Sequence, residues 1–309
     1  MRRGKEGETT NHKSQITNHK SQIIHHKLFN TITIVGVGLI SGSLSIALKD
    51  RGLVKHVIGV SRTKASADKA LELGLADEML PLEEAVKRAD LIYVAIPVDT
   101  TLPIMQTIME LVTDKQIIVD AGSTKGALCN ALSGHPMRSR FVASHPMWGT
   151  EFSGPEAAVR NAFIGRTCVI CEGEKSDTDA LEVTEEMYRQ IGMHLIYMDA
   201  DAHDMHVAYI SHISHITSFA LANTVLEKEK EEDTIFEMAS SGFESTVRLA
   251  KSNPAMWVPI FMQNRENILD VLNEHITQLR KFKSCLEKEN SEYLMELIVG
   301  ANDIKRILK

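Results

Sequence analysis

Short runs of β-branched and apolar residues alternate with amphipathic segments over the first two thirds of the chain. Strands that alternate with helices are typical of βαβ units, in which helices cover both faces of a parallel sheet. The pattern therefore predicts an α/β domain over residues 30–200. The runs that we expect to form its strands are residues 31–35, 56–61, 91–96, 116–120, 141–144 and 167–171.

The periodicity changes after the last of these strands, and every strong pattern that follows is helical. Residues 203–227 read as one long helix. Asn253-Pro254 is a typical helix start, because proline is favoured at the first helical position, and a helix starting there could run to Glu287. Such a long amphipathic helix needs a partner. We therefore expect residues 201–309 to form an all-α domain that makes a homodimer through its C-terminal helices.

Residues 1–29 differ from the rest of the chain because they are polar and basic. The heptapeptide TNHKSQI occurs in them twice, at 10–16 and at 17–23. The segment lacks the apolar core of a secretory signal. Its composition is typical of a disordered tail, and the alternatives are a basic arm or a metal-binding histidine tract.

Composition narrows the possible partners. The net charge of −7 and the 5% of aromatic residues argue against a nucleic-acid surface. No apolar run approaches the roughly 20 residues that cross a bilayer, so we expect no membrane partner. Cys168 and Cys171 form a CxxC pair, but residues three apart on a strand point to opposite faces. We interpret them as buried thiols of a cytoplasmic protein rather than as a redox or metal pair.

A glycine-rich loop follows the first predicted strand and precedes a predicted helix. Gly36 would allow a tight turn, and Gly38 would let the backbone approach a pyrophosphate at the helix N-terminus. Ser41 replaces the third glycine of the usual GxGxxG pattern, and Gly42 follows it. The context predicts a Rossmann-like dinucleotide site. The residues that we assign to the cofactor in and around this loop are Gly36, Gly38, Leu39, Ile40, Ile96 and Pro97.

The acidic residue that usually holds the ribose 2′-hydroxyl of NAD is missing from the end of the second strand. That position reads Ser61-Arg62. A hydroxyl and a guanidinium can instead bind a 2′-phosphate, so we slightly favour NADP over NAD. The alternative is that Arg62 stacks on the adenine and that NAD is bound.

Two polar residues at predicted strand ends are suited to a substrate hydroxyl. His145 follows a strand and precedes Pro146, and a fixed imidazole is a suitable general base near neutral pH. The alternative is a structural turn histidine. Ser123 follows a strand where an α/β sheet opens its crevice, and it could contact the hydroxyl, cap a helix, or do both.

Two further sets of residues lie in the helical part. Arg248 stands between Val247 and Leu249, so we expect it to be partly shielded and to bind a substrate carboxylate; an ion pair with Glu244 is the alternative. One straight helix cannot gather the histidines that follow residue 200 around one metal, so we predict no metal site. We expect His212 or His215 to contact substrate or cofactor instead. The histidines considered as metal ligands were His203, His206, His212 and His215.

Taken together, these motifs resemble the prephenate/arogenate dehydrogenases of tyrosine biosynthesis, in order from about residue 31 to the C-terminus. Trp148 departs from the family's pattern, since a smaller residue is expected there. The motifs that carry the resemblance are Gly36-x-Gly38-Leu39-Ile40-x-Gly42-Ser43, Gly122-Ser123-x-Lys125, His145-Pro146-x-x-Gly149-Thr150-Glu151, Ser211-His212-x-x-His215 and Gly242-Phe243 with Arg248-x-Ala250-Lys251 and Met256-Trp257.

The resemblance implies an oxidative decarboxylation. Hydride leaves C4 of a cyclohexadienol for the nicotinamide, the ring carboxylate departs as CO₂, and the ring becomes aromatic. By the same resemblance His145 would take the 4-hydroxyl proton and Ser123 would orient His145 or the hydroxyl. The residues assigned to substrate are Arg248, His215, His212 and Trp257.

We expect prephenate rather than arogenate, because no acidic residue can be assigned to the ammonium group of arogenate. An arogenate dehydrogenase is the first alternative. A β-hydroxyacid dehydrogenase, with a helical lysine as its base, is the second. A regulatory dimer that senses NAD(P) is the alternative that is not an enzyme.

Overall fold

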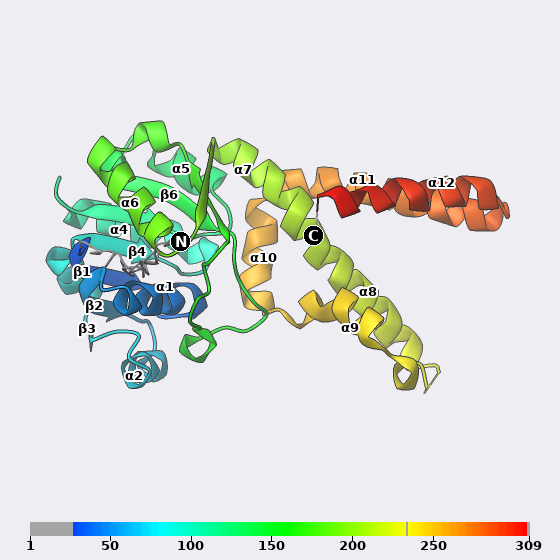
Figure 1. The fold of residues 1–309 in the computed structure, drawn as a ribbon, viewed down its shortest axis with the longest axis horizontal. Helices are drawn as coiled ribbons and strands as arrows, with labels where there is room; N and C mark the ends of the chain where they lie inside the picture. The colour runs from blue at the N-terminus through cyan, green and yellow to red at the C-terminus, as the bar shows by residue number, and fades with distance from the viewer. Residues whose placement is uncertain (1–26, 233, 308–309) are drawn as a thin grey trace, which may run out of the picture.

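The computed structural model describes residues 27–232 and 234–307. The tail that we expect at residues 1–29 therefore lies almost wholly outside the described residues. The described chain has an α/β part, whose last strand ends at Met198, and a helical part that begins at Ala200 (Figure 1). None of the described helices combines the length and the hydropathy needed to span a bilayer.

One eight-stranded sheet organises the α/β part. Its strands are β1 (Phe29–Val35), β2 (Val54–Val60), β3 (Glu78–Met79), β4 (Leu91–Val94), β5 (Ile117–Asp120), β6 (Phe141–Pro146), β7 (Thr167–Cys171) and β8 (His194–Met198). Their order is β3-β2-β1-β4-β5-β6-β7-β8, and only β6 and β7 pair antiparallel. The sheet confirms the predicted Rossmann-like fold. The sequence pattern missed β3, which has two residues, and β8, which has no fully buried residue.

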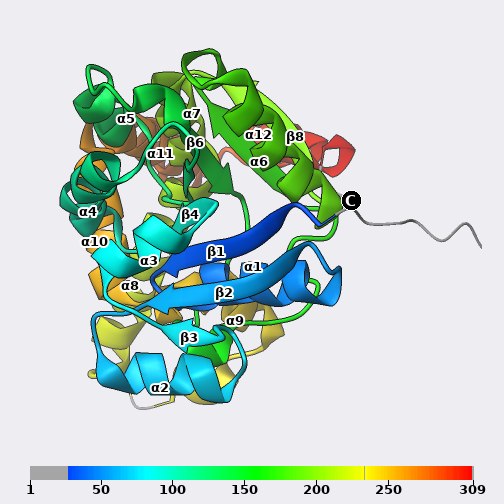
Figure 2. The same ribbon diagram turned by 90° about the vertical axis from the view of Figure 1, so that its left-hand side faces the viewer.

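Helices cover both faces of this sheet (Figure 2). Leu44 of α1 and Tyr188 of α6 join the core on one face, and Met105 of α4 and Leu128 of α5 join it on the other. The two separate clusters explain why the central strands are apolar on both sides. The helices of this part are α1 (Leu39–Asp50), α2 (Lys64–Glu72), α3 (Leu82–Arg88), α4 (Val98–Leu111), α5 (Gly126–Leu132) and α6 (Thr178–Gln190).

The helical part projects from the sheet as two arms, one containing α8 and α9 and the other α11 and α12 (Figure 1). A π-helical turn, Ala208–His212, joins α7 to α8 without a break. The helices are α7 (Ala200–Val207), α8 (Ile213–Glu229), α9 (Ser241–Val247), α10 (Pro254–Gln263), α11 (Arg265–Glu287) and α12 (Ser291–Ala301).

The prediction of one helix from Pro254 to Glu287 is wrong, because the chain breaks at Asn264. This buried side chain donates from Nδ2 to the carbonyl oxygen of Asp204 (2.6 Å) and to Nδ1 of His212 (3.1 Å). Asparagine side chains favour such bonds over the regular helix, and the backbone of Asn264 is not helical (φ −104°, ψ 27°). Hydrophobic periodicity does not reveal a break that tertiary hydrogen bonds produce.

Gly42 sits where α1 meets its neighbours most closely. A Cβ there would lie 2.8 Å from the Cβ of Ala158 and 3.0 Å from Cδ1 of Leu75. The third glycine of the GxGxxG pattern normally allows this close packing of the helix. In this chain Gly42, one position further on, has that role. Ser41 fills the usual place, buried, with its hydroxyl bonded to the carbonyl oxygen of Gly36.

Gly42→Val should lower the free energy of unfolding by about 1–3 kcal/mol, because the added carbons overpack this contact. Gly134→Ala is the matched control, since a Cβ at Gly134 meets no atom within 4 Å. It should stay within about 0.5 kcal/mol of wild type. Urea denaturation measures both variants, and equal stabilities would contradict the packing assigned to Gly42.

Candidate active site

The turn between β1 and α1 has the features of an anion site. Gly36 has φ +87°, and a Cβ there would lie 2.5 Å from the carbonyl oxygen of Ala95, so the position requires glycine. Gly38 is the N-cap of α1, and a Cβ on it would meet no atom within 4 Å, so the space beside it is open. The first turn of α1, with Leu39 and Ile40, has no acidic residue and no side-chain cap, which leaves its N–H groups available to a phosphate.

The other predicted cofactor residues lie along the same edge of the sheet. Ile96 borders the glycine loop, since its Cγ2 would lie 2.7 Å from a Cβ on Gly36. Pro97 is the N-cap residue of α4. Ser61 and Arg62 follow β2, and Arg62 is exposed. Because β2, β1 and β4 are adjacent and parallel, their carboxyl ends bring these residues to one crevice.

Helix α10 lies against this edge and joins the helical part to it. Gln263 donates from Nε2 to the carbonyl oxygen of Val98 (2.8 Å) and accepts on Oε1 from the hydroxyl of Thr124 (2.7 Å). Trp257 and Ile260 pack on Val98. The turns after β4 and β5 are thus in contact with the helical part, which places the assigned substrate residues of that part beside the cofactor crevice.

A buried polar network holds the end of β6. The ammonium group of Lys125 bonds to Oδ2 of Asp120 and to the carbonyl oxygen of Ser144 (2.8 Å). The hydroxyl of Ser144 bonds to the carbonyl oxygen of Asp120 (2.6 Å) and to the hydroxyl of Tyr188 (2.7 Å). All four residues are fully buried. His145, the next residue, therefore has a rigid backbone and belongs to the strand itself rather than to the turn after it.

His145 is the first member of a hydrogen-bonded line that enters the helical part. Its Nδ1 lies 2.8 Å from Nε2 of His203, and Nδ1 of His203 lies 2.8 Å from Oδ1 of Asp204. Both partners belong to α7. His203 is fully buried and the Asp204 side chain is nearly so. Nε2 of His145 is the ring nitrogen left for a ligand.

The surroundings favour neutral His145 and ionised Asp204. Burial lowers the pKa of His145 well below its usual range, and the neighbouring His203, Lys125 and His212 add to this effect. Burial acts to raise the pKa of Asp204, but the hydrogen bond from His203 and two backbone amides outweigh it and hold that pKa below its usual value. A neutral imidazole has the lone pair that a general base needs.

Ser123 is half-buried in the turn between β5 and α5. Its prediction as a helix cap is wrong, because α5 begins at Gly126 and the carboxylate of Asp204 accepts the N–H groups of Lys125 (2.8 Å) and Gly126 (2.8 Å). A carboxylate from another part of the chain has taken the place of a local cap. Asp120 pairs in register with Ala143 on adjacent parallel strands, so the turn that carries Ser123 and the end of β6 that carries His145 lie at the same edge of the sheet.

The expectation that Arg248 is shielded is wrong. Half of its side chain (52%) is exposed, because adjacent residues in a helical turn point in different directions and Val247 and Leu249 do not cover it. Its nearest acid is Glu151 (3.3 Å), in the loop that follows His145, rather than Glu244. Arg248 therefore extends toward the strand end that carries the histidine.

The other predicted substrate residues lie together. The rings of His215 and Trp257 stack with centroids 3.4 Å apart, and His212 meets Trp257 edge-on at 6.0 Å. Burial lowers the pKa of His215, and the charge of Arg248 lowers it further. His212 is completely buried against Asn264, which makes it a support for this cluster rather than an open contact. The indole N–H of Trp257 is buried with no partner in the described chain.

Trp148 belongs to a different set of contacts. It packs against the core beneath α1 and meets Phe163 edge-on, with ring centroids 5.7 Å apart. The large side chain therefore anchors the loop after His145 instead of filling the space around the imidazole.

The CxxC cysteines face opposite sides of β7, Cys168 in one core cluster and Cys171 in the other. Burial raises the pKa of Cys168 to about 12, so its thiol stays protonated. The predicted buried thiols are thus confirmed. Within residues 27–232 and 234–307, no group of three histidine, cysteine or acidic side chains is arranged to hold a metal.

Sequence reasoning missed four residues of the site, namely His203, Asp204, Glu151 and Asn264. We considered His203 only as a metal ligand and gave Asp204 no role. An aspartate directly after a histidine is also a signal for an oriented imidazole, because a carboxylate often fixes the histidine tautomer. The partner of that imidazole, 58 residues away in the sequence, is not visible from spacing.

Two family models match consecutive stretches of the chain. The model described as "Prephenate dehydrogenase, nucleotide-binding domain" matches residues 44–197, and "Prephenate dehydrogenase, dimerization domain" matches residues 199–299.

Individual relatives agree with these matches. Prephenate dehydrogenase from Bacillus subtilis is 30% identical over 89% of this chain and 75% of its own length. Cyclohexadienyl dehydrogenase from Zymomonas mobilis is 28% identical over 91% of this chain and 97% of its own. The crystal structure of prephenate dehydrogenase from Aquifex aeolicus in complex with hydroxyphenyl propionate and NAD⁺ is similar, with a TM-score of 0.82 and 30% identity over 90% of this chain and 97% of that one.

Stability should depend on pH through His212. Burial lowers its pKa to about 4, with Asp204 opposing the shift. A histidine in the unfolded chain has a pKa near 6.5. Between that pH and about pH 4, His212 is therefore protonated in the unfolded chain but not in the folded one. The free energy of unfolding should fall by about 3 kcal/mol from this group as the pH drops across that interval.

Urea denaturation of His212→Gln should show a shallower loss of stability between these pH values than wild type. The exposed His194→Gln is the matched control and should retain the wild-type slope. If the His212 variant also retains that slope, another group causes the pH dependence.

Proposed function

The chain belongs to the prephenate dehydrogenase family, and from this premise we propose that it catalyses the oxidative decarboxylation of prephenate to 4-hydroxyphenylpyruvate with NAD(P). One observation carries the proposal. His145 is fixed beside the dinucleotide crevice with Nδ1 engaged by His203, which leaves Nε2 for a substrate hydroxyl.

The β1–α1 turn fits a dinucleotide, since Gly36 permits the turn, the space at Gly38 is open, and the start of α1 is uncapped. A nicotinamide cofactor held by this turn would supply the acceptor for the hydride of ring C4. Nε2 of His145 takes the proton of the 4-hydroxyl as the C4–O bond gains double-bond character. The ring carboxylate then departs as CO₂, and its bonding electrons complete the aromatic ring. The oxygen recovers a proton from His145, so the reaction releases no net proton.

Three groups are suited to orient the substrate. Arg248 is half-exposed and can exchange Glu151 for a substrate carboxylate in a charge-assisted pair. The buried indole N–H of Trp257 has no partner in the described chain, and a ligand oxygen would satisfy it. Ser123 lies in the turn after β5, at the same edge of the sheet as His145, and can bond the 4-hydroxyl.

Prephenate fits this site better than the alternatives. The relative from Bacillus subtilis, 30% identical to this chain, is a prephenate dehydrogenase. A β-hydroxyacid dehydrogenase would need a lysine base, and the buried lysine beside the site, Lys125, is committed to Asp120. An assay that crosses prephenate and arogenate with NAD and NADP, read by the absorbance of the reduced nicotinamide, tests the proposal. If none of the four combinations of substrate and cofactor is turned over, the proposed function is wrong.

His145→Asn should lower kcat on prephenate by about 10²–10⁴-fold, the usual contribution of a general base, because the amide cannot accept the hydroxyl proton. The dinucleotide site is separate, so its affinity, measured by fluorescence titration, should stay within about twofold of wild type. Wild-type turnover in this variant would exclude His145 as the base.

We propose NADP as the preferred cofactor. Helix α2 follows β2 directly, and neither the β2–α2 turn nor the first turn of α2 carries an acid that would repel a 2′-phosphate. Arg62 is exposed at this turn and can pair with the phosphate.

Arg62→Ala should lower kcat/KM with NADP by about 10–100-fold, the value of one or two charged hydrogen bonds, and leave kcat/KM with NAD nearly unchanged. Lys64→Ala is the matched control, because Lys64 is two residues further on and pairs with Asp68 (2.6 Å). Equal losses with both cofactors would show that Arg62 stacks on the adenine instead.

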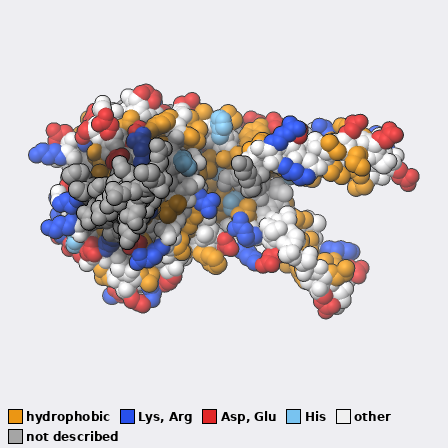
Figure 3. Space-filling view, in the orientation of Figure 1, with side chains coloured by type: hydrophobic (Ala, Val, Ile, Leu, Met, Phe, Trp, Pro, Cys, Tyr) orange, Lys and Arg blue, Asp and Glu red, His pale blue; other side chains and the backbone are white. Residues whose placement is uncertain are grey.

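We propose that the protein is a cytoplasmic homodimer assembled through the helical arms. The arms carry many large apolar side chains that face solvent in a single chain (Figure 3). Burying such a face between two copies is the usual origin of a symmetric dimer. The exposed apolar residues of α11 and α12 include Leu279, Leu286, Met295, Ile298 and Val299. The four cysteines are free and buried, which suits a reducing compartment.

A further inference from the structure

We propose that Asp204 and His203 are positioning residues that fix the tautomer of His145, so that the base is ready before substrate binds. The effect on turnover rests on the proposed function, but the tautomer is a property of the free protein. The proposal follows from the donors and acceptors along the line from Asp204 to His145.

The line has one consistent arrangement of protons while Asp204 is ionised. A carboxylate only accepts hydrogen bonds, so Nδ1 of His203 must carry the proton in the 2.8 Å contact with Oδ1. In neutral His203 the other nitrogen, Nε2, is then an acceptor. Nδ1 of His145 must therefore donate to it across 2.8 Å, and Nε2 of His145 is left with a lone pair.

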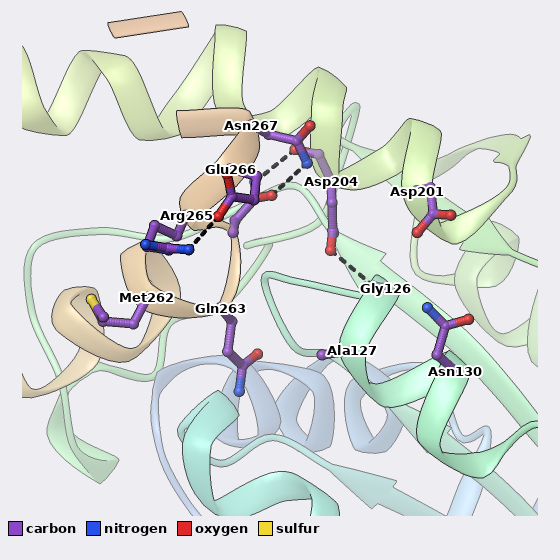
Figure 4. Close-up of a pocket in the computed structure, with 11 residues that line it drawn as sticks. Gly126, Ala127, Asn130, Asp201, Asp204, Met262, Gln263, Arg265, Glu266 and Asn267 are labelled. Atoms are coloured by element: carbon purple, nitrogen blue, oxygen red, sulfur yellow. Dashed lines mark hydrogen bonds and ion pairs between the residues drawn. The ribbon is translucent and has the colours of Figure 1, made fainter. Parts of the chain in front are cut away.

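Asp204 is well placed to stay ionised. Its carboxylate accepts the backbone N–H groups of Lys125 and Gly126, each at 2.8 Å, at the start of α5. It also lines a polar cavity of about 370 Å³ (Figure 4). The wall of this cavity is lined mainly by polar residues, and such surroundings favour the charged form of the carboxylate. Other residues that line this cavity are Asn130, Asp201, Gln263, Asn264 and Glu266.

The remaining charged groups near the line do not disturb this arrangement. Lys125 and Asp120 are buried as a pair with each other. His212 stays neutral because burial lowers its pKa to about 4. The carboxylate of Asp204 thus orients His203, and His203 orients His145. The negative charge of Asp204 also stabilises the imidazolium that forms while His145 holds the hydroxyl proton.

Asp204→Asn removes the charge that allows only one arrangement of protons along the line. Oδ1 of Asp204 accepts from both His203 and the N–H of Lys125, and Oδ2 accepts from Gly126, so an amide NH₂ opposes a backbone donor at either position. Where the NH₂ takes the Oδ1 position, it donates to Nδ1 of His203, and Nε2 of His203 then carries the proton and donates to Nδ1 of His145. Nε2 of His145 then carries a proton and cannot accept one. The comparable substitution in the serine-protease triad, an example taken from general enzymology, lowers kcat by about 10⁴-fold through the wrong tautomer.

The first measurement is nitrogen-15 NMR of the histidine rings in the full-length protein without substrate, at a pH where His145 is neutral. Disappearance of the signals in His145→Asn assigns the resonances. Wild type should show a protonated Nδ1 and a bare Nε2 on His145, and Asp204→Asn should show a larger population of the tautomer protonated on Nε2. A wild-type His145 protonated on Nε2 would overturn the proposal without any need for turnover.

The second measurement is steady-state turnover of prephenate. Asp204→Asn should lower kcat by about 10²–10⁴-fold with little change in KM or in dinucleotide affinity. Asp201→Asn is the matched control, because it removes the same charge from the same cavity without touching His203, and it should stay within about twofold of wild type. Circular dichroism checks that both variants are folded.

The outcomes separate the two proposals. If wild type turns over prephenate and Asp204→Asn behaves like Asp201→Asn, the positioning role is wrong and the proposed function stands. If wild type shows the expected tautomer but turns over neither prephenate nor arogenate, the proposed function is wrong and the tautomer assignment stands.

Discussion

The buried carboxylate of Asp204 is the group on which the arrangement of the active site depends. The carboxylate accepts hydrogen bonds from His203 and from the backbone amides at the start of α5. The backbone carbonyl of Asp204 accepts another from Asn264. A buried donor that loses such a partner costs about 1–3 kcal/mol. The same interactions that join the helical part to the sheet therefore also place the histidine that we propose as the base.

The sheet and the helical part contribute different halves of the proposed site. The carboxyl ends of β1, β2 and β4 provide the dinucleotide crevice, and the end of β6 provides His145 on a backbone fixed by Lys125 and Asp120. The helical part provides the cation Arg248 and the aromatic surface of Trp257. Burial at the junction keeps His145 neutral, which suits a reaction in which aromatisation supplies the driving force and the protein has mainly to orient the substrate and hold a proton.

The sequence was most informative where function depends on local geometry. Gly36 is required by its own backbone conformation, and the strand–turn–helix context is visible in the pattern of β-branched and apolar residues. The sequence was misleading where hydrogen bonds to residues far away in the chain determine the local structure. Asn264 interrupts a strong helical period, and Asp204 caps a helix from 78 residues away, so that Ser123 is not needed as a cap. Arg248 was wrongly expected to be shielded, because its apolar neighbours point elsewhere.

The central claim is that His145 meets the substrate hydroxyl through Nε2 while His203 holds Nδ1. A crystal structure with the dinucleotide and the product 4-hydroxyphenylpyruvate tests it most directly. We predict that the phenol oxygen lies about 2.6–3.2 Å from Nε2 of His145, with the contact between Nδ1 and His203 retained. A ring bound out of reach of His145, or an imidazole that turns to present Nδ1 to the ligand, would contradict the account.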